Sequence, residues 1–456
     1  MPTNGGINIG RTVQSAIYRD GVYGRRPAVP TDPDALAAAA RRRMTRTGWS
    51  YVAGGAGAQR TVAANREAFG RYRIVPRQMV DVGQRSLATT LLGRELPAPV
   101  LFGPVGALEL AVQHQRGGRA AAPRNAEPAL ARAARDLGLP VVISSQASTP
   151  MEDTAAALGD SPRWFQLYWS SDDALVESFV SRAEASGCEA IVVTLDTHVL
   201  GWRTADLDLG YLPFARAEGI AQYLSDPVFR ALVEARVQAS AASSESAPAN
   251  RPTVAAVRSL LSMARHHPGP TLRNLTQPHA RAAVETFLEV FSRSTLTWAD
   301  LARLRERTTL PILVKGIQHP DDARAALDHG ADGIVVSNHG GRQIDNAVAS
   351  IDALGPVVDA VRKWSGASGS ETAGSVPGSV PVLFDSGVRT GADVFTALAL
   401  GADAVLLGRP WVYGLALAGA DGVRAVAEHV LAELDLTMAL AGVSGTDQIG
   451  RHNLAL

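Results

Sequence analysis

The stretch PVLFDSGVRTGADVFTALALGADAVLLGRP, residues 381–410, carries the pattern that decides the fold. A short apolar run ends in a small polar cluster, an alanine-rich segment follows and ends in a glycine, and a second apolar run comes next. Continuous apolar runs are typical of parallel strands buried on both faces. A glycine after a periodic segment is a common helix stop. The stretch therefore predicts a strand, a helix and a second, parallel strand.

The same unit recurs along the chain. The runs that we interpret as strands are residues 99–106, 140–146, 163–169, 189–196, 311–316, 332–341, 381–387 and 403–409. Helical segments that end in glycine, such as PALARAARDLG and HPDDARAALDHG, lie between them. Eight alternations of strand and helix favour a closed (β/α)8 barrel, or TIM barrel, over an open doubly wound sheet. The predicted fold class is therefore α/β.

The remaining segments define the predicted organisation. Residues 1–95 are expected to cover the barrel with an N-terminal helical segment, residues 96–430 to form the barrel, and residues 431–456 to form a C-terminal tail. An insertion at 205–295 follows the fourth strand, where connections are usually short, and is expected to serve as a lid or an oligomer contact. The low-complexity stretches 240–252 and 365–379 are expected to be mobile, and 113–128 is an unusually long loop.

Composition excludes several classes of protein. The 456 residues are 46% hydrophobic and 19% charged, which is ordinary for a globular protein. The formal net charge of zero predicts no broad basic face for nucleic acid or a membrane surface. No apolar run reaches the roughly 18 residues of a membrane span, and the N-terminus lacks the pattern of a signal peptide. The single cysteine, Cys188, fits a reducing compartment. We therefore expect a soluble, cytoplasmic protein.

Polar residues collect at the predicted carboxyl ends of the strands, which is where the active sites of such barrels lie. These residues are Gln166, Tyr168, Thr194, Asp196, Lys315, Ser337, Asn338, His339, Arg342, Asp385, Gly387, Arg389, Gly408 and Arg409. One histidine, two acids and several cations are thus expected to converge on one rim.

The segment SNHGGRQ, residues 337–343, combines a histidine with an arginine three residues later. An imidazole can take a proton and a guanidinium can hold a carboxylate, so His339 and Arg342 suit a substrate that carries both groups. Alternatively, His339 is a structural histidine bonded to backbone carbonyl groups. Asp196 either caps the following helix or, beside the imidazole, stabilises its charged form.

Lysine is rare in this chain, since only Lys315 and Lys363 occur among the 44 basic residues. A lysine at a strand end therefore indicates a position that needs a compact ammonium group, or else one too narrow for a guanidinium group. The strand ends DSGVRTG and LGRP each combine glycine with arginine, which is typical of a phosphate cradle. Two ordinary turns are the alternative. A cradle would bind a phosphorylated substrate or a phosphate-bearing cofactor.

Together, SNHGGRQ, FQLYW (165–169), TLDT (194–197) and DSGVRTGADVFTALALGA with GRP resemble the FMN-dependent α-hydroxy-acid oxidase and dehydrogenase family, from about Tyr51 to Trp411. GWSYVAGGAG (48–57), TPMED (149–153) and SDPVFRALV (225–233) are most similar to the lactate 2-monooxygenase subgroup. The resemblance implies that His339 is the base and that Asp196 pairs with it. It also implies that Arg342 and Tyr51 clamp the substrate's carboxylate, with Tyr168 and Arg203 near the substrate.

The resemblance further implies that FMN is the cofactor, with Lys315 beside its N1 and C2 carbonyl edge. Pro104, Val105 and Gly106 would lie near N5. The isoalloxazine and ribityl groups would contact Ser144, Gln166, Thr194 and Ser337. The ribityl hydroxyls and the phosphate would contact Asp385, Gly387, Arg389, Gly408 and Arg409. No metal site is expected, and a homotetramer or a larger homo-oligomer is implied.

The expected reaction is the oxidation of a small L-2-hydroxy acid, first of all L-lactate, by O2, with oxidative decarboxylation to acetate, CO2 and water. One alternative is an oxidase that releases the 2-oxo acid and H2O2. Another is a dehydrogenase that acts on a larger acid such as mandelate, because Gln146, Leu108 and His198 depart from the family pattern where they could line the pocket. A third is a sugar-phosphate aldolase or isomerase, in which Lys315 would form a Schiff base.

Overall fold

The computed structural model describes residues 8–113, 126–242, 253–368 and 380–455. Most of the long loop predicted at 113–128 lies outside these residues, as do most of the two low-complexity stretches at 240–252 and 365–379.

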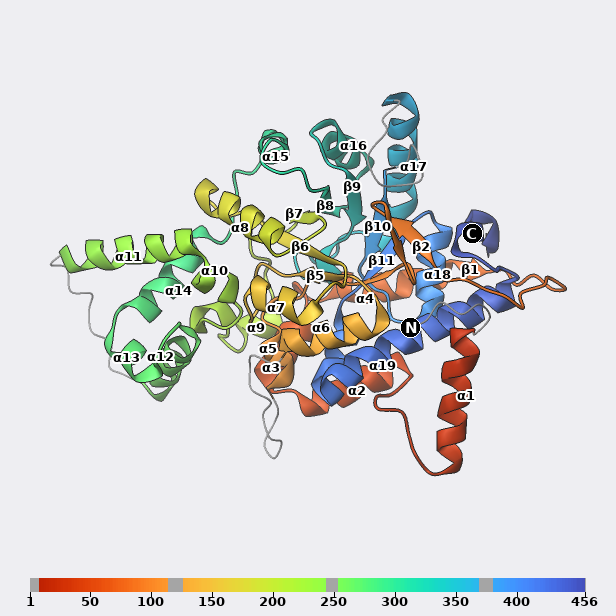
Figure 1. Ribbon diagram of the computed structural model, residues 1–456, viewed down its shortest axis with the longest axis horizontal. Coiled ribbons are helices and arrows are strands. Elements are labelled where there is room, and N and C mark those ends of the chain that lie inside the picture. Colours follow the sequence, from red (N-terminus) through yellow and green to blue (C-terminus); the bar gives the residue numbers. More distant parts are fainter. Residues whose placement is uncertain (1–7, 114–125, 243–252, 369–379, 456) are drawn as a thin grey trace.

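Eight parallel strands form a closed barrel, so the predicted (β/α)8 fold is confirmed (Figure 1). They are β4 (Val100–Phe102), β5 (Val141–Ile143), β6 (Arg163–Tyr168), β7 (Ile191–Thr194), β8 (Ile312–Ile317), β9 (Gly333–Val336), β10 (Val382–Asp385) and β11 (Ala404–Leu407). Each strand pairs with the next along the chain, and β11 closes the barrel by pairing with β4. Seven of them lie within the runs that the sequence predicts as strands, and β8 extends one residue beyond the run predicted at 311–316.

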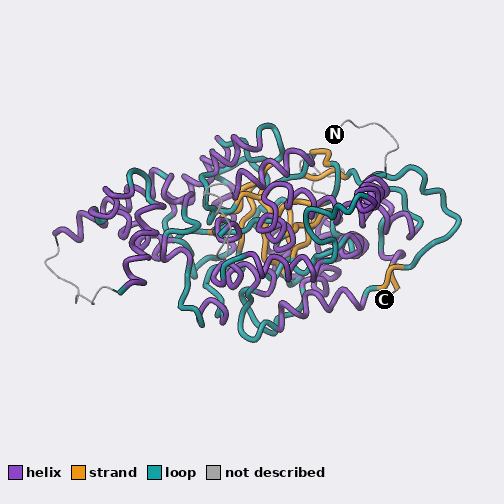
Figure 2. Tube along the Cα trace, turned by 90° about the horizontal axis from the view of Figure 1, so that it is seen from below, coloured by secondary structure: helices purple, strands orange, loops and turns teal. Residues whose placement is uncertain are grey.

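Helices enclose the barrel on all sides, as Figure 2 shows. They are α6 (Ala126–Leu137), α7 (Met151–Leu158), α8 (Asp173–Ala185), α15 (Trp298–Arg305), α16 (Pro320–Asp328), α17 (Ser350–Ser368), α18 (Gly391–Ala399) and α19 (Arg409–Ala441). Within residues 381–410, α18 begins with a capping box. The Thr390 hydroxyl accepts from the Asp393 amide at 3.1 Å, and the Asp393 carboxylate accepts from the Thr390 amide at 3.0 Å.

The interior of the barrel is filled with side chains. Every strand contributes at least one apolar residue to a buried cluster that includes Leu101, Val142, Trp164, Val192, Leu313, Val335, Leu383, Ala404 and Leu406. A hairpin of β2 (Thr89–Leu91) and β3 (Arg94–Leu96) directly precedes β4, and its Leu91 and Leu96 join the same cluster. The hairpin therefore closes the amino-terminal end of the barrel, and ligands have access only from the opposite end.

The chain before the barrel forms α1 (Ile9–Val22), α2 (Pro33–Arg43), α3 (Arg46–Ala53), α4 (Arg60–Glu67), η1 (Ala68–Arg71) and β1 (Arg73–Ile74), and α5 (Glu109–Val112) follows β4. Both α1 and α2 pack on α19, which runs across position 430, where the sequence predicts the start of a tail. The chain then forms η5 (Thr446–Gln448), η6 (Arg451–Asn453) and β12 (Leu454–Ala455). Since β12 pairs antiparallel with β1, the last residues are part of the folded domain.

The insertion between β7 and β8 is mostly helical and extends from one side of the barrel, at the left of Figure 1. It contains α9 (Thr204–Leu207), η3 (Pro213–Arg216), α10 (Ala221–Ser225), α11 (Pro227–Ala242), α12 (Val254–His266), α13 (Thr271–Thr276) and α14 (His279–Val290). The fully buried Asp226 joins it to α8, because its carboxylate accepts from Ser178 Oγ at 2.7 Å and from Arg182 Nη1 at 3.0 Å.

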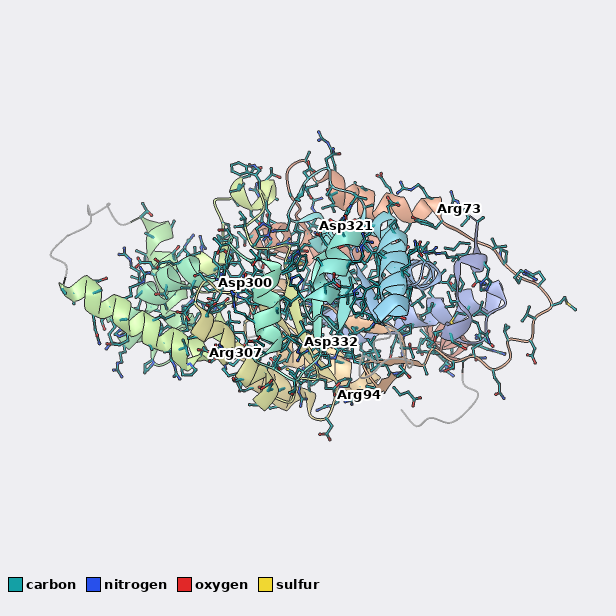
Figure 3. All side chains as sticks on the ribbon, turned by 90° about the horizontal axis from the view of Figure 1, so that it is seen from above. Arg73, Arg94, Asp300, Arg307, Asp321 and Asp332 are labelled. Carbon is teal, nitrogen blue, oxygen red and sulfur yellow. The ribbon has the colours of Figure 1, made fainter. Side chains whose placement is uncertain are left out.

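Charges of both signs are interspersed on the outer helices and on the turns beside them. Arg305 pairs with Asp332 at 2.7 Å, and Arg307 pairs with Glu177 at 2.8 Å. Figure 3 labels Arg307, Asp321 and Asp332 among them. None of the helices in the described ranges is both long enough and apolar enough to cross a membrane.

Candidate active site

A cavity of about 1070 Å³ opens at the carboxyl ends of the strands. Fourteen of the predicted site residues line it: Tyr51, Pro104, Val105, Gly106, Tyr168, Arg203, Lys315, His339, Arg342, Asp385, Gly387, Arg389, Gly408 and Arg409. They lie at or after the ends of seven of the eight barrel strands, all but β5, and in α3, which closes the cavity from the N-terminal segment. The structure therefore brings together residues that lie more than half the chain apart.

The other five predicted residues are close by but do not line the cavity. Three of them form a buried row across the ends of β5, β6 and β7, in which Ser144 Oγ donates to Gln166 Oε1 at 3.0 Å. The amide of Gln166 in turn donates to Thr194 Oγ1 at 3.1 Å. Ser337 and Asp196 lie beside this row, where each contacts a residue that faces the cavity.

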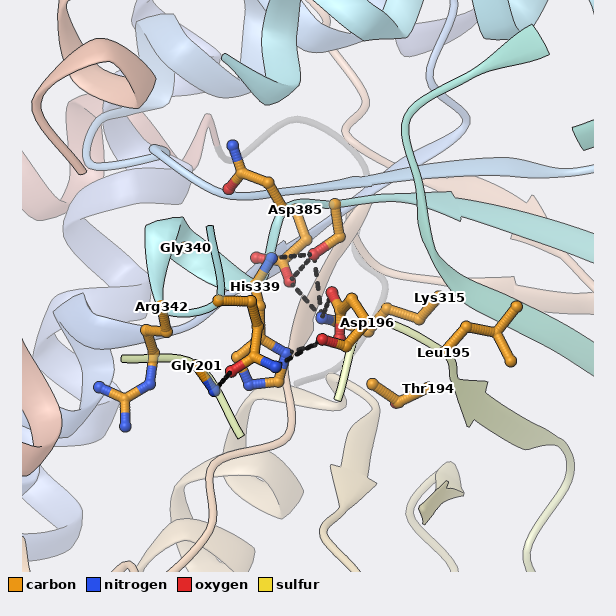
Figure 4. A network of polar contacts seen from close by, with 12 residues as sticks. Thr194, Leu195, Asp196, Gly201, Lys315, His339, Gly340, Arg342 and Asp385 are labelled. Carbon is orange, nitrogen blue, oxygen red and sulfur yellow. Dashed lines mark hydrogen bonds and ion pairs between the residues drawn. The ribbon is translucent and has the colours of Figure 1, made fainter. Parts of the chain in front are cut away.

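His339 and Asp196 form a hydrogen-bonded pair with 2.8 Å between Nδ1 and Oδ1 (Figure 4). An ionised carboxylate only accepts hydrogen bonds, so Nδ1 carries the proton and Nε2 keeps its lone pair. Burial lowers the pKa of His339 below its ordinary value, and the charge of Lys315 adds to that effect. Burial opposes ionisation of Asp196 as well, but the charges of His339 and Lys315 outweigh it and lower the pKa of Asp196. The pair is thus a neutral imidazole held by a carboxylate, which is the arrangement of a general base.

The turn that carries His339 has an unusual backbone. In η4 (His339–Gly341), three successive residues have positive φ: His339 at 57°, Gly340 at 65° and Gly341 at 74°. A Cβ on Gly341 would lie 2.7 Å from the amide nitrogen of Val62, so this position requires glycine. A histidine rarely adopts such a φ, and residues with a strained backbone concentrate at functional sites. The paired glycines of SNHGGRQ therefore allow the turn that aims the imidazole at the cavity.

Lys315 lies between two carboxylates. Its Nζ is 3.1 Å from Asp385 Oδ2 and 4.0 Å from Asp196 Oδ2, and it donates to Ser337 Oγ at 2.9 Å. Burial by itself would lower the pKa of this ammonium group, but Asp385 and Asp196 outweigh it and raise the pKa above its ordinary value. Schiff-base lysines need a lowered pKa to act as nucleophiles. This geometry therefore disfavours the aldolase alternative and favours a fixed positive charge.

Two arginines face the cavity beside the histidine. Arg342 lies with its Cζ 4.9 Å from the centroid of the Tyr51 ring, and it donates to the carbonyl oxygen of Gly54 at 3.0 Å and to that of Tyr51. Arg203 is buried and donates to Gln343 Oε1 at 2.9 Å. Burial, with the nearby charge of Arg342, lowers the pKa of Arg203 to about 10. Two cations this close together suit an anionic group between them, such as a carboxylate.

A second pair of arginines lies at the other end of the cavity, after β10 and β11. Burial lowers the pKa of Arg389 below its ordinary value. Burial also lowers the pKa of Arg409, to about 9. Arg409 also holds α3, since it donates to the carbonyl oxygens of Val52, Gly340 and Gly54 at 2.9 to 3.0 Å. Gly387 has φ 98°, and a Cβ there would lie 2.2 Å from the carbonyl oxygen of Asn65. This position therefore requires glycine, and the turn packs directly against the backbone of Asn65.

All four cavity-lining arginines share one property. Within the described part of the chain, none of Arg203, Arg342, Arg389 and Arg409 forms an ion pair with a carboxylate, although all lie in or beside the buried end of the barrel. Buried charges are normally paired. These residues thus fit a cavity that receives negative groups at two ends, as a carboxylate substrate and the phosphate of FMN require.

The cavity is also lined by residues that are not among the predicted catalytic and cofactor-binding residues. They are Val52, Gln146, Thr197, Leu200, Phe214, Phe291, Gly340, Ser386, Val388, Leu406 and Val412. Of the three positions that departed from the family pattern, Gln146 lines the cavity. Leu108 is buried elsewhere, and His198 faces a separate surface depression with Trp202. Phe214 and Phe291 come from the insertion, and only the path of that insertion in space reveals them.

The comparisons with known proteins agree with this geometry. A sequence model described as FMN-dependent dehydrogenase matches residues 40–456. The FMN-dependent alpha-hydroxy acid dehydrogenase qulF of Penicillium citrinum is 39% identical over 438 residues, which cover 96% of this chain and 93% of that protein. The L-lactate oxidase of Lysinibacillus sphaericus is 37% identical over 88% of this chain and 86% of its own. The crystal structure of mandelate oxidase with (S)-2-phenylpropionate superposes with a TM-score of 0.69 at 31% identity, covering 94% of this chain and 98% of that one.

Proposed function

This chain belongs to the family of FMN-dependent dehydrogenases, and on that basis we propose that it oxidises a small L-2-hydroxy acid, with L-lactate as the first candidate and O2 as the electron acceptor. Its cofactor is FMN and its chemistry is the oxidation of 2-hydroxy acids, so the family and cofactor predicted from the motifs are confirmed. The observation that carries the proposal is His339, held by Asp196, in one cavity with two sets of arginines that form no ion pair with a carboxylate among the residues that the structure describes.

We propose the following roles toward FMN, which accepts two electrons from the substrate when it is bound. Arg389, Arg409 and the open turn at Gly387 hold its phosphate, and Asp385 and Gly408 hold the ribityl chain. Lys315 places a fixed positive charge at the pyrimidine edge of the ring. The remaining contacts are those that the resemblance implies: Pro104, Val105, Gly106, Ser144, Gln166, Thr194 and Ser337.

The substrate side of the site acts through binding and proton transfer. Arg203, Arg342 and the Tyr51 hydroxyl hold the substrate's carboxylate, which places the carbon that bears the hydroxyl group near Nε2 of His339. Nε2 of His339 then takes a proton from the substrate, and the carboxylate of Asp196 stabilises the imidazolium that forms. Burial raises the pKa of Tyr168 to about 12, so its hydroxyl stays protonated and donates to the substrate oxygen.

We further propose that the 2-oxo acid stays bound long enough for hydrogen peroxide, formed from O2, to decarboxylate it, so that lactate yields acetate, CO2 and water. The support is the insertion, which contributes Phe214 and Phe291 to the cavity wall, where they would slow the escape of the product. The second candidate outcome is release of the 2-oxo acid and H2O2, which the similarity to an L-lactate oxidase favours. The similarity to a mandelate oxidase supports a larger acid as the alternative substrate.

The first experiment is an absorbance spectrum of the purified protein, followed by addition of L-lactate without oxygen and then by air. The expected result is a flavin spectrum that bleaches with lactate and returns in air, with acetate in excess of pyruvate when catalase is present. Pyruvate as the main product in the presence of catalase, with free peroxide detected when catalase is left out, would contradict the decarboxylation and support the oxidase outcome. A flavin that bleaches with L-mandelate but not with lactate would overturn lactate as the substrate.

Two further properties are part of the proposal. We propose a homotetramer or a larger homo-oligomer, in keeping with the family resemblance. Exposed apolar side chains around the separate surface depression that contains His198, such as Trp202 at 72% exposed and Ile344 at 66% exposed, provide surface for such contacts. We also propose that the enzyme acts in the cytoplasm, where its only cysteine, the buried Cys188, would remain reduced.

A further inference from the structure

The insertion contributes two side chains to the cavity, and both are phenylalanines. Phe214 belongs to η3, and Phe291 directly follows α14, near the end of the insertion. Within residues 205–295, so far as the structure describes them, no other side chain lines the cavity. The insertion therefore adds apolar surface to the site and no charge.

A stack of aromatic rings fixes these two side chains. The ring of Phe291 stacks on that of Phe287 with centroids 5.3 Å apart and an interplanar angle of 18°. Phe287 is fully buried and also packs against Phe214 at 5.4 Å and against the edge of Tyr223 at 4.8 Å. Buried aromatic pairs of this kind add to the free energy gained by burial alone. The wall is therefore held by the core of the insertion.

The backbone next to Phe291 is tied to the barrel. The carbonyl oxygen of Val290 accepts from Ser170 Oγ at 2.7 Å and from the amide of Ser171 at 3.1 Å. These serines directly follow β6, the strand that ends in Tyr168. These two hydrogen bonds hold Val290, and with it the neighbouring Phe291, close to the end of β6 and therefore to Tyr168.

The apolar wall adjoins the groups that bind the carboxylate. The Tyr51 ring contacts Phe214 edge to face at 6.2 Å, and the guanidinium group of Arg342 lies over the same ring. A 2-hydroxy acid has a carboxylate, a hydroxyl and a side chain on adjacent atoms. When the arginines hold the carboxylate and His339 faces the hydroxyl-bearing carbon, the side chain is the part left to meet the phenylalanines.

We propose that Phe291 is the wall against which the substrate's side chain packs, and that it restricts this enzyme to 2-hydroxy acids with short, apolar side chains. The inference rests on the proposed function, because it requires a 2-hydroxy acid in the cavity. It goes further in assigning the choice of side chain to one residue of the insertion that no motif of the sequence indicates.

The test compares Phe291→Ala and Phe291→Leu with Phe229→Leu. Phe229 is a matched control because it is fully buried in the same insertion, packs on Tyr223 at 5.4 Å and does not line the cavity. For each protein, kcat/KM is measured with L-lactate and with L-2-hydroxyhexanoate. The dissociation constants of pyruvate and 2-oxohexanoate are measured from the change in flavin absorbance.

Phe291→Ala is expected to raise the ratio of kcat/KM for the six-carbon acid over lactate by about tenfold or more, because each methylene group in an apolar pocket changes this ratio by about that factor. The ratio of the two dissociation constants should change in the same direction, and Phe291→Leu should have a smaller effect. Phe229→Leu should leave both ratios unchanged even if it lowers stability.

The proposal is wrong if Phe291→Ala retains flavin and leaves both ratios unchanged. It is also wrong if Phe229→Leu shifts them equally, since the effect would then come from general loosening of the insertion. If no 2-hydroxy acid reduces the flavin of the unaltered enzyme, the proposed function fails instead. In that case the ratio of the dissociation constants of pyruvate and 2-oxohexanoate, compared between Phe291→Ala and the unaltered protein, still tests whether the side chain of the ligand packs against Phe291.

Discussion

At the scale of single residues, Asp196 connects the two halves of the site. Its Oδ1 accepts from His339 and its Oδ2 lies 4.0 Å from Lys315. All three residues could be predicted because each is a chemically distinctive residue at the carboxyl end of a predicted strand. Phe291 could not, because a phenylalanine after a helix has no feature that separates a cavity wall from ordinary core.

Replacing His339 by Gln removes the group proposed to accept the proton but keeps a side chain of similar size. We expect kcat/KM for the 2-hydroxy acid to fall by about 10²- to 10⁴-fold, the range typical of a lost general base. Bound flavin should be retained. Steady-state kinetics with oxygen uptake measures the effect, and His319→Gln is the control because His319 is 64% exposed on the surface. A loss of less than tenfold would exclude His339 as the base.

The pH dependence of kcat/KM reports on the same pair. His339 acts when neutral and burial lowers its pKa, so activity should fall only as the pH drops below about 6.5, the ordinary value for histidine. The charge of Asp196 raises the pKa of His339, so Asp196→Asn should move this acid limb to still lower pH and reduce the maximum. A pH profile of both proteins checks the sign. A limb that moves to higher pH in the variant would contradict the assignment.

Lys315 is expected to matter for stability as well as for chemistry. Lys315→Met leaves Asp385 and Asp196 without their shared cation, and loss of one partner in a buried pair costs about 3 kcal/mol or more. The free energy of unfolding in urea measures this loss. The other lysine of the chain is the control: Lys363 is exposed, and Lys363→Met should change stability by less than about 0.5 kcal/mol. Equal effects of the two substitutions would overturn this account of Lys315.

At the scale of elements, the strands follow from the sequence and the insertion does not. Each barrel strand is a continuous apolar run that ends in polar residues, and this local pattern suffices to place it. The insertion has apolar helices as well, but their packing depends on contacts far apart in the chain, such as Asp226 with Ser178 and Arg182. Likewise, no local pattern indicates that Arg409 holds the carbonyl end of α3.

Asp226 is expected to be the main polar anchor of the insertion. Besides its bonds to α8, its carboxylate accepts from the amides of Val228 and Phe229 at the start of α11, at 2.8 and 3.1 Å. Asp226→Ala removes these bonds and leaves Arg182 with only part of its partners, so we expect a loss of about 3–5 kcal/mol. Thermal unfolding followed by circular dichroism measures it. Asp421→Ala, in a surface pair with Arg424, should be nearly neutral, and an equally small effect of Asp226→Ala would refute the anchor.

At the scale of the whole molecule, eight predicted strand–helix units were enough to favour closure, and the barrel is closed. The pairing of β1 with β12 could not be predicted, because strands of two residues leave no periodicity in a sequence. The number of chains in the assembly could not be predicted from one sequence either. We expect four chains per particle in size-exclusion chromatography with light scattering, and a stable monomer that retains full activity would rule out the proposed tetramer.

Closure by β4 and β11 has a consequence for how the protein is made. β4 is the first barrel strand to leave the ribosome and its partner β11 is the last, so one edge of β4 has no partner while most of the chain is being translated. At ordinary rates of synthesis that interval lasts tens of seconds. An exposed strand edge is a template for aggregation. Nascent chains of this enzyme are therefore expected to need protection by chaperones until residue 407 has emerged, and the barrel forms only after translation is nearly complete.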